Sequence, residues 1–406
     1  MDRTQTLIAS AFVLALAHSA VSAAETPVDF SREILPILSN KCFVCHGPDS
    51  RKEDLLRLDS FEGATSDLGG YRAVNPGDLA KSEIIARIHD ADDPMPPEDA
   101  EKQLTATERK LLERWVREGG GYAEHWAFVP PVKATPPSQG HPIDAFVENQ
   151  FAGDIDFAAE ADKPTLARRL ALVLTGLPPS PELLQSFLDD GSSNAYDQLV
   201  ERLLADPRYG EHQARYWLDA VRYGDTHGLH LDNKRGIYPY RDWVVRSLNS
   251  NQPLDEFIEW QLAGDLLPEP TMEQRIATGY VRMNPSTSEG GAIPAEFQAK
   301  NNFDRTETLG TVFLGMTMLC SRCHTHKYDP IEQTEYYRLL AFFNNTAEGP
   351  LDGNKYDYAP TLKVPADQAA WNHWTHLESA RDRLLAKAGA KDRKSTRLNS
   401  SHSEIS

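Results

Sequence analysis

The sequence has few cysteines and a large deficit of positive charge, and both shortages restrict what the protein can be. Only four of its 406 residues are cysteine, and all four belong to two Cys-x-x-Cys-His motifs, so none is left for a disulfide framework. The formal net charge is −18, and no basic stripe is present to meet nucleic-acid phosphates. Such a charge favours basic protein partners over nucleic acid or an anionic membrane surface.

Long apolar runs are also missing. An apolar stretch at residues 7–17 follows Arg3 and precedes small residues at 21–23, which is typical of a cleavable signal peptide. A membrane anchor is the alternative, but this stretch is too short to cross roughly 30 Å of hydrocarbon as a helix, and no later stretch is longer. We therefore expect no membrane span and an exported protein, located in the periplasm, at the cell surface or outside the cell.

The two Cys-x-x-Cys-His motifs have the spacing that attaches a c-type haem. Two intervening residues place both sulfurs along one haem edge, where they form thioether bonds, and the histidine then binds the iron as the proximal ligand. Zinc, a redox dithiol and two very small disulfide loops are the alternatives. The motifs predict one haem c at the first site and a second at the other. Their residues are Cys42, Cys45 and His46, and Cys320, Cys323 and His324.

The haem iron at the first motif also needs a sixth ligand or an open position. Met95 is the only methionine of this region after the initiator, and it lies in a stiff Pro-rich loop at residues 93–97. A Met/His pair raises the reduction potential, which suits electron transfer. We expect Met95 to be the distal ligand. His89 competes for this role, and Met95 would otherwise only fill a gap in the packing.

The second motif is less specific, because His326 follows closely after His324. Two cysteines and two histidines could also form a tetrahedral zinc site, and structural cysteines are a third alternative. The order of the residues favours haem. His326 cannot be the distal ligand of a haem held by His324, because one intervening residue cannot carry the chain around the haem edge. The same argument excludes Met316 and Met318.

A segment at residues 219–242 is dense in acids, histidines and arginines around a glycine-containing loop. Asp225, His227, His230 and Asp232 are weak candidates for a catalytic site there. Either histidine could also reach the second haem iron while a nearby aspartate orients its ring. A buried ion-pair network that locks the loop between helices is the alternative, and we favour it. The sequence contains no Ser/His/Asp elbow, phosphate loop or dinucleotide fingerprint.

Helical spacing recurs along the chain, and no alternating run is long enough for a large sheet. The clearest helix is at residues 104–118, where Thr105 and Glu108 form a capping box. The expected fold class is mainly α, with a small cytochrome c-like domain followed by a larger helical domain. The expected parts are a signal peptide at 1–23, a haem domain at 26–121, a Pro-rich linker at 122–140, a helical domain with the second motif at 141–346, a helical extension at 347–390, and a disordered or non-native tail at 391–406.

Residues 29–97 resemble the planctomycete cytochrome c domain, and residues 141–346 resemble the helical domain of unknown function that follows it in those proteins. The matching stretches are 34–38, 42–47, 56–59 and 95–97 in the first region, and 142–144, 174–179, 209–211, 217–219, 240–243, 261–268 and 320–331 in the second. The resemblance implies haem binding and electron transfer in an exported multidomain protein. Such relatives usually continue into a further large domain, so residues 347–390 could be its truncated start.

Two functions remain open from the sequence. The first is an exported c-type cytochrome with redox partner proteins, within a multidomain protein that could act as a haem-dependent oxidoreductase. The second is a cell-surface binding or assembly protein, with polysaccharide as one ligand class, an auxiliary haem, and zinc or another metal at the second motif. The motifs favour an electron-transfer protein over a stand-alone catalyst.

Overall fold

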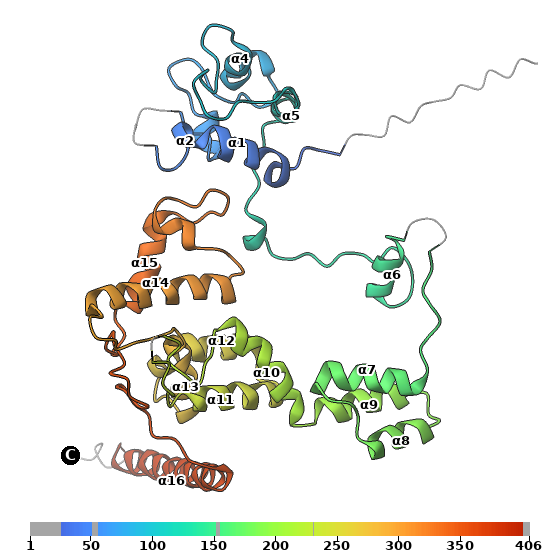
Figure 1. Cartoon of the computed structure of the whole chain (residues 1–406), viewed down its shortest axis with the longest axis vertical. Coiled ribbons are helices and arrows are strands. Elements are labelled where there is room, and N and C mark those ends of the chain that lie inside the picture. Colours follow the sequence, from blue (N-terminus) through green and yellow to red (C-terminus); the bar gives the residue numbers. More distant parts are fainter. Residues whose placement is uncertain (1–25, 51–55, 152–154, 230, 401–406) are drawn as a thin grey trace, which may run out of the picture. The chain divides into compact units, whose positions relative to one another are not determined.

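The computed structural model describes residues 26–50, 56–151, 155–229 and 231–400 (Figure 1). Within these ranges the chain forms sixteen α-helices and a few short 3₁₀ or π turns, and it forms no β-strand. The expected mainly α fold class is therefore confirmed. The expected signal peptide lies outside the described residues. Among the described helices, none has both the length and the apolar character that crossing a membrane requires.

The chain divides into two compact units. The first contains residues up to Val132 together with Thr325–Pro330, and the second contains the rest. The helical elements of the first unit are η1 (Phe30–Ile34), α1 (Leu35–Lys41), α2 (Phe43–His46), α3 (Phe61–Thr65), η2 (Leu79–Lys81), α4 (Glu83–His89), α5 (Ala106–Arg117) and η3 (Trp126–Phe128). The predicted linker at 122–140 thus contains the short η3 turn.

The core of the first unit joins its first helical turns to α5. Trp115 of α5 is buried, and its ring centroid lies 6.1 Å from that of Phe30 in η1. The predicted capping box at the start of α5 is present, because the Glu108 amide donates to the Thr105 hydroxyl at 3.2 Å and the Thr105 amide donates to the Glu108 carboxylate at 2.7 Å. The Lys41 ammonium donates to the same carboxylate at 2.7 Å, which ties the end of α1 to α5. These contacts fix the position at which the first motif begins.

The second unit is a set of packed helices. They are α6 (Pro142–Glu148), α7 (Lys163–Thr175), α8 (Pro181–Asp189), α9 (Ala195–Leu204), α10 (Arg208–Ala220), α11 (Tyr238–Asn249), α12 (Leu254–Ala263), η4 (Gly264–Leu266), α13 (Met272–Ala277), η5 (Thr278–Arg282), α14 (Pro294–Phe313), η6 (Leu319–Arg322), α15 (Gln333–Phe343) and α16 (Gln368–Ser400). One of its cores is aromatic: Trp243 of α11 stacks on Phe257 of α12 with centroids 5.0 Å apart. The fold of this unit therefore rests on helix-to-helix packing.

Two helices differ from the sequence-based expectation. The long helix α14 lies where we predicted none, since its buried face is polar and includes Asn301, Asn302 and Arg305. The helix α16 runs to Ser400 and so enters the segment 391–406, for which we expected a polar tail. Residues 401–406 lie outside the described residues.

Candidate functional site

The first Cys-x-x-Cys-His motif forms a single helical turn. Cys42 precedes α2, and its carbonyl oxygen accepts hydrogen bonds from the amides of Cys45 at 3.1 Å and His46 at 2.9 Å. The turn therefore carries two thiols and one imidazole within five residues. Cys42 and Cys45 are free thiols, so the alternative of a small disulfide loop is not formed here.

The imidazole of His46 is oriented by the main chain. Its Nδ1 atom lies 3.0 Å from the carbonyl oxygen of Leu56. Because a carbonyl oxygen only accepts, Nδ1 carries the proton, and Nε2 of the neutral ring keeps its lone pair. Metal-binding histidines are oriented in the same way, with one nitrogen donating to a carbonyl and the other facing the metal. The donor set thus fits a haem iron bound through Nε2.

The environment of Cys42 favours a thiol over a thiolate. Burial raises the pKa of Cys42 to about 12, and the nearby Lys41 lowers it only in part. Cys45, by contrast, is exposed. The two thiols of the motif therefore lie in different surroundings, and the choice between haem, zinc and a dithiol stays untested by this contrast.

Met95 lies after α4, in the loop that the sequence predicted to be stiff. Its side chain is half-buried, and its amide donates to the carbonyl oxygen of Arg87 at 2.9 Å. Asp93 forms an ion pair with Arg87 at 2.5 Å, which fastens the same loop to α4. The competing residue His89 is engaged elsewhere, because its Nε2 lies 2.7 Å from the carboxylate of Glu113 in α5. The assignment of Met95 as the distal ligand stays a prediction.

The second motif forms a looser turn at the end of η6. The amides of Cys323 and His324 lie 3.3 and 3.4 Å from the carbonyl oxygen of Cys320, and both thiols are exposed. Arg322 anchors this turn, since its Nε lies 2.9 Å from the Glu307 carboxylate of α14. The motif is therefore presented on an ordered turn, and the second haem stays a prediction.

The zinc alternative at the second motif stays untested. His326 is used locally, because its Nδ1 accepts a hydrogen bond from the amide of Asp329 at 2.8 Å. In the described part of the chain, no three histidine, cysteine or acidic side chains are placed to hold a metal ion.

His227, from the segment 219–242, is a buried part of the scaffold. Its Nδ1 lies 3.1 Å from the Asp352 carboxylate and 3.0 Å from the Ser286 hydroxyl, and its Nε2 lies 3.0 Å from the carbonyl oxygen of Lys355. Both ring nitrogens are thus engaged, and binding of iron would require at least one of these contacts to break. Asp352 could not be found from the sequence, since it lies in a distant turn without a motif.

The other three candidates of this segment lie in different settings. Asp225 is exposed and accepts a hydrogen bond from the Tyr223 hydroxyl at 2.5 Å. Asp232 accepts from the amide of Gly228 at 2.8 Å, which closes the loop on itself. His230 lies outside the described residues. Local contacts such as these stabilise the conformation of a loop. A catalytic role for the four residues stays untested.

Comparison with known families agrees with the order of the two regions. The family described as Planctomycete cytochrome C matches residues 42–99, which include the first motif and Met95. The family described as Protein of unknown function (DUF1549) matches residues 142–348, just over half of the chain, with the second motif near its end. The predicted resemblance is thereby confirmed. Neither a curated protein nor a solved structure matches the chain.

Proposed function

Because the chain belongs to the protein family of unknown function DUF1549 and carries a planctomycete cytochrome c domain before it, we propose that it is an exported c-type cytochrome that transfers electrons. The cytochrome domain itself implies a haem-binding role. Electron transfer, export and the number of haems are parts of the proposal. Haem, when bound, supplies an iron that alternates between the ferrous and ferric states.

The observation that carries the proposal is the orientation of His46. The carbonyl oxygen of Leu56 holds the Nδ1 proton, which leaves Nε2 to face an iron, while Cys42 and Cys45 lie on the same helical turn for attachment. A hydrogen bond of this kind also makes the histidine a better electron donor to the metal, which tunes the reduction potential. These residues support haem attachment independently of the family comparison.

The charge of the chain supports a redox partner of opposite sign. With a net charge of −18, encounter with a basic protein would be accelerated at low salt and slowed as the ionic strength rises. The signal peptide predicted at the N-terminus supports export. Outside the cytoplasm, covalent attachment keeps haem from being lost. Both features fit an electron-transfer protein outside the cytoplasm.

Haem content tests the proposal directly. The full chain would be produced in a host with haem-maturation machinery, and covalent haem per chain would be measured by pyridine haemochrome. We expect covalent haem in the parent, and one haem fewer when Cys42 and Cys45 are both changed to Ala. The matched control is the same pair of changes at Cys320 and Cys323. A folded parent without covalent haem would contradict the proposal, and haem that cannot be reduced and reoxidised reversibly would exclude electron transfer.

A further inference from the structure

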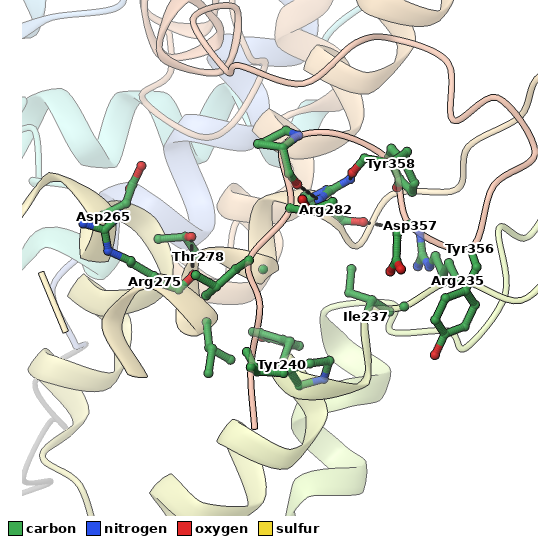
Figure 2. A pocket seen from close by; sticks show the side chains of 18 residues that line it. Arg235, Ile237, Tyr240, Asp265, Arg275, Thr278, Arg282, Tyr356, Asp357 and Tyr358 are labelled. Atoms are coloured by element: carbon green, nitrogen blue, oxygen red, sulfur yellow. Dashed lines mark hydrogen bonds between the residues drawn. The ribbon is translucent and has the colours of Figure 1, made fainter. Parts of the chain in front are cut away.

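The second unit contains a cavity of about 270 Å³ that belongs to neither motif (Figure 2). Its walls come from the start of α11, from α13 and η5, and from the extended segment 356–364. That last segment lies beyond the residues matched by the family. Ligand pockets in proteins are usually somewhat larger, so an occupant would be a small molecule.

Arg235 places an unneutralised positive charge at this cavity. Its side chain is only 4% exposed, and it donates to the carbonyl oxygens of Gly224 at 3.0 Å and Asn284 at 3.0 Å, with longer bonds to two further carbonyls. No carboxylate of the described residues forms an ion pair with it, and burial lowers its pKa. Carbonyl groups solvate a guanidinium but do not cancel its charge, so a buried anion nearby would be stabilised.

A second arginine of the cavity, Arg282, shares its carboxylate partner with another arginine. The Nε of Arg282 lies 3.0 Å from one oxygen of Glu348, and the other oxygen of Glu348 is paired with the buried Arg305. Burial lowers the pKa of Arg305 to about 10, and the nearby Asp304 opposes this effect only in part. Among the ion pairs of the described residues, Arg282 and Arg305 thus share one carboxylate, and Arg235 has none. This local excess contrasts with the acidic charge of the whole chain.

Donors for a ligand remain on two of the lining arginines. A guanidinium has five N–H groups. Arg282 donates from two of them, to the carbonyl oxygens of Tyr358 and Pro360, and its Nε faces Glu348 in an ion pair without a hydrogen bond. Arg275 uses only one, on the carbonyl oxygen of Pro270. Among the described residues these two side chains thus keep free N–H groups, which pair well with a carboxylate.

The remaining lining is suited to the body of a small organic molecule. The rings of Tyr356 and Tyr358 lie on the same side of the cavity, and the Arg282 guanidinium stacks 4.2 Å from the Tyr358 centroid (Figure 2). Asp265 and Asp357 also line the cavity; both are exposed, as Arg275 is, so that water screens the charges of all three. We propose that this cavity binds a small organic carboxylate, whose anionic group faces Arg282 and Arg275 and whose body packs against Tyr356.

Calorimetric titration of the full-length protein tests the site at constant ionic strength. The probes are glucuronate, benzoate and citrate, with glucose as the neutral counterpart of glucuronate. We expect at least one carboxylate to bind, glucose not to bind, and Arg275→Gln to weaken binding by roughly tenfold or more. Arg275 is exposed, so this change leaves the fold intact. Arg202→Gln, an exposed arginine of α9 outside the cavity, is the matched control and should bind as the parent does.

Three results would overturn the proposal. They are the absence of binding by all three carboxylates, equal binding of glucose and glucuronate, and unchanged affinity in Arg275→Gln. If Arg235→Gln folds, it should weaken binding as well, because it removes the unneutralised charge. The titration has no haem readout, so its outcome is independent of the proposed cytochrome function.

Discussion

The Oδ2 atom of Asp352 lies 3.1 Å from the Nδ1 atom of His227, and both side chains are withdrawn from solvent. The contact joins the loop after α10 to the turn that precedes the cavity-lining segment 356–364. A further backbone bond joins the same parts, from the amide of Gly236 to the carbonyl oxygen of Tyr356 at 2.8 Å. This loop contains the weak catalytic candidates of the sequence analysis. In the structure it makes contacts that hold together the segments around the cavity.

Asp352→Ala should destabilise the second unit strongly. The change removes one of the two polar contacts of the buried Nδ1 atom of His227 and leaves a gap in the packing, which typically costs about 2 to 3 kcal/mol of unfolding free energy. Urea unfolding followed by tryptophan fluorescence measures this loss. The matched control is Asp242→Ala, since Asp242 forms a solvent-exposed pair with Arg241 at 2.9 Å and should cost less than about 1 kcal/mol. Equal losses in the two variants would show that the buried contact is not special.

Met95→Leu should remove the sulfur ligand without opening a gap in the packing. We expect the oxidised protein to show the weak near-infrared charge-transfer band that marks sulfur bound to ferric haem, and the variant to lose it. The reduction potential should fall at the same time, because a thioether ligand raises it. Met272→Leu, a partly buried methionine of the second unit, is the control. A band that survives in Met95→Leu would leave Met95 as a packing residue.

The contact between Lys41 and Glu108 should make the first unit sensitive to acid. Partial burial raises the pKa of Glu108, but hydrogen bonds from Lys41 and Thr105 outweigh this effect, and the pKa lies below its ordinary value. A carboxyl group whose pKa is lowered on folding stabilises the fold above its unfolded pKa of about 4.3, and this stability is lost as the pH falls through the folded pKa.

Glu108→Gln tests this expectation, because glutamine can keep the capping box while the charge is lost. At pH 7 we expect a loss of about 1 kcal/mol in unfolding free energy, and near pH 2 we expect no difference from the parent. Thermal unfolding at several pH values measures it. Glu101→Gln, at an exposed position, should behave as the parent throughout. A difference that persists at low pH would mean that the amide disturbs packing and that the charge is unimportant.

The sequence predicts the first motif and its helices well, because local chemistry decides them. The capping box at Thr105 and the turn from Cys42 to His46 depend on residues close along the chain. The long helix α14 could not be found in this way. Its buried face carries Asn301 and Arg305, which bond to the side chains of other segments, so no apolar period marks it.

Contacts between segments that are distant in the sequence could not be predicted, and they determine how several site residues are oriented. The carbonyl oxygen of Leu56 orients His46, but a backbone group has no sequence signature. Arg235 and Asp352 face their partners only after the loops have come together. The partners of a polar segment decide whether it forms a catalytic site or a structural network. For this reason the sequence of residues 219–242 was compatible with both roles.

The contacts of His227 also decide how the second haem should be tested. Its ring nitrogens are engaged by Asp352, Ser286 and the carbonyl oxygen of Lys355, so we expect it not to be the distal ligand. Electron paramagnetic resonance of the oxidised protein should show a second low-spin signal that disappears when Cys320 and Cys323 are both changed to Ala. His227→Gln should leave that signal unchanged, although it lowers stability. If the signal is lost in a folded His227→Gln protein, iron replaces one of these contacts when haem binds.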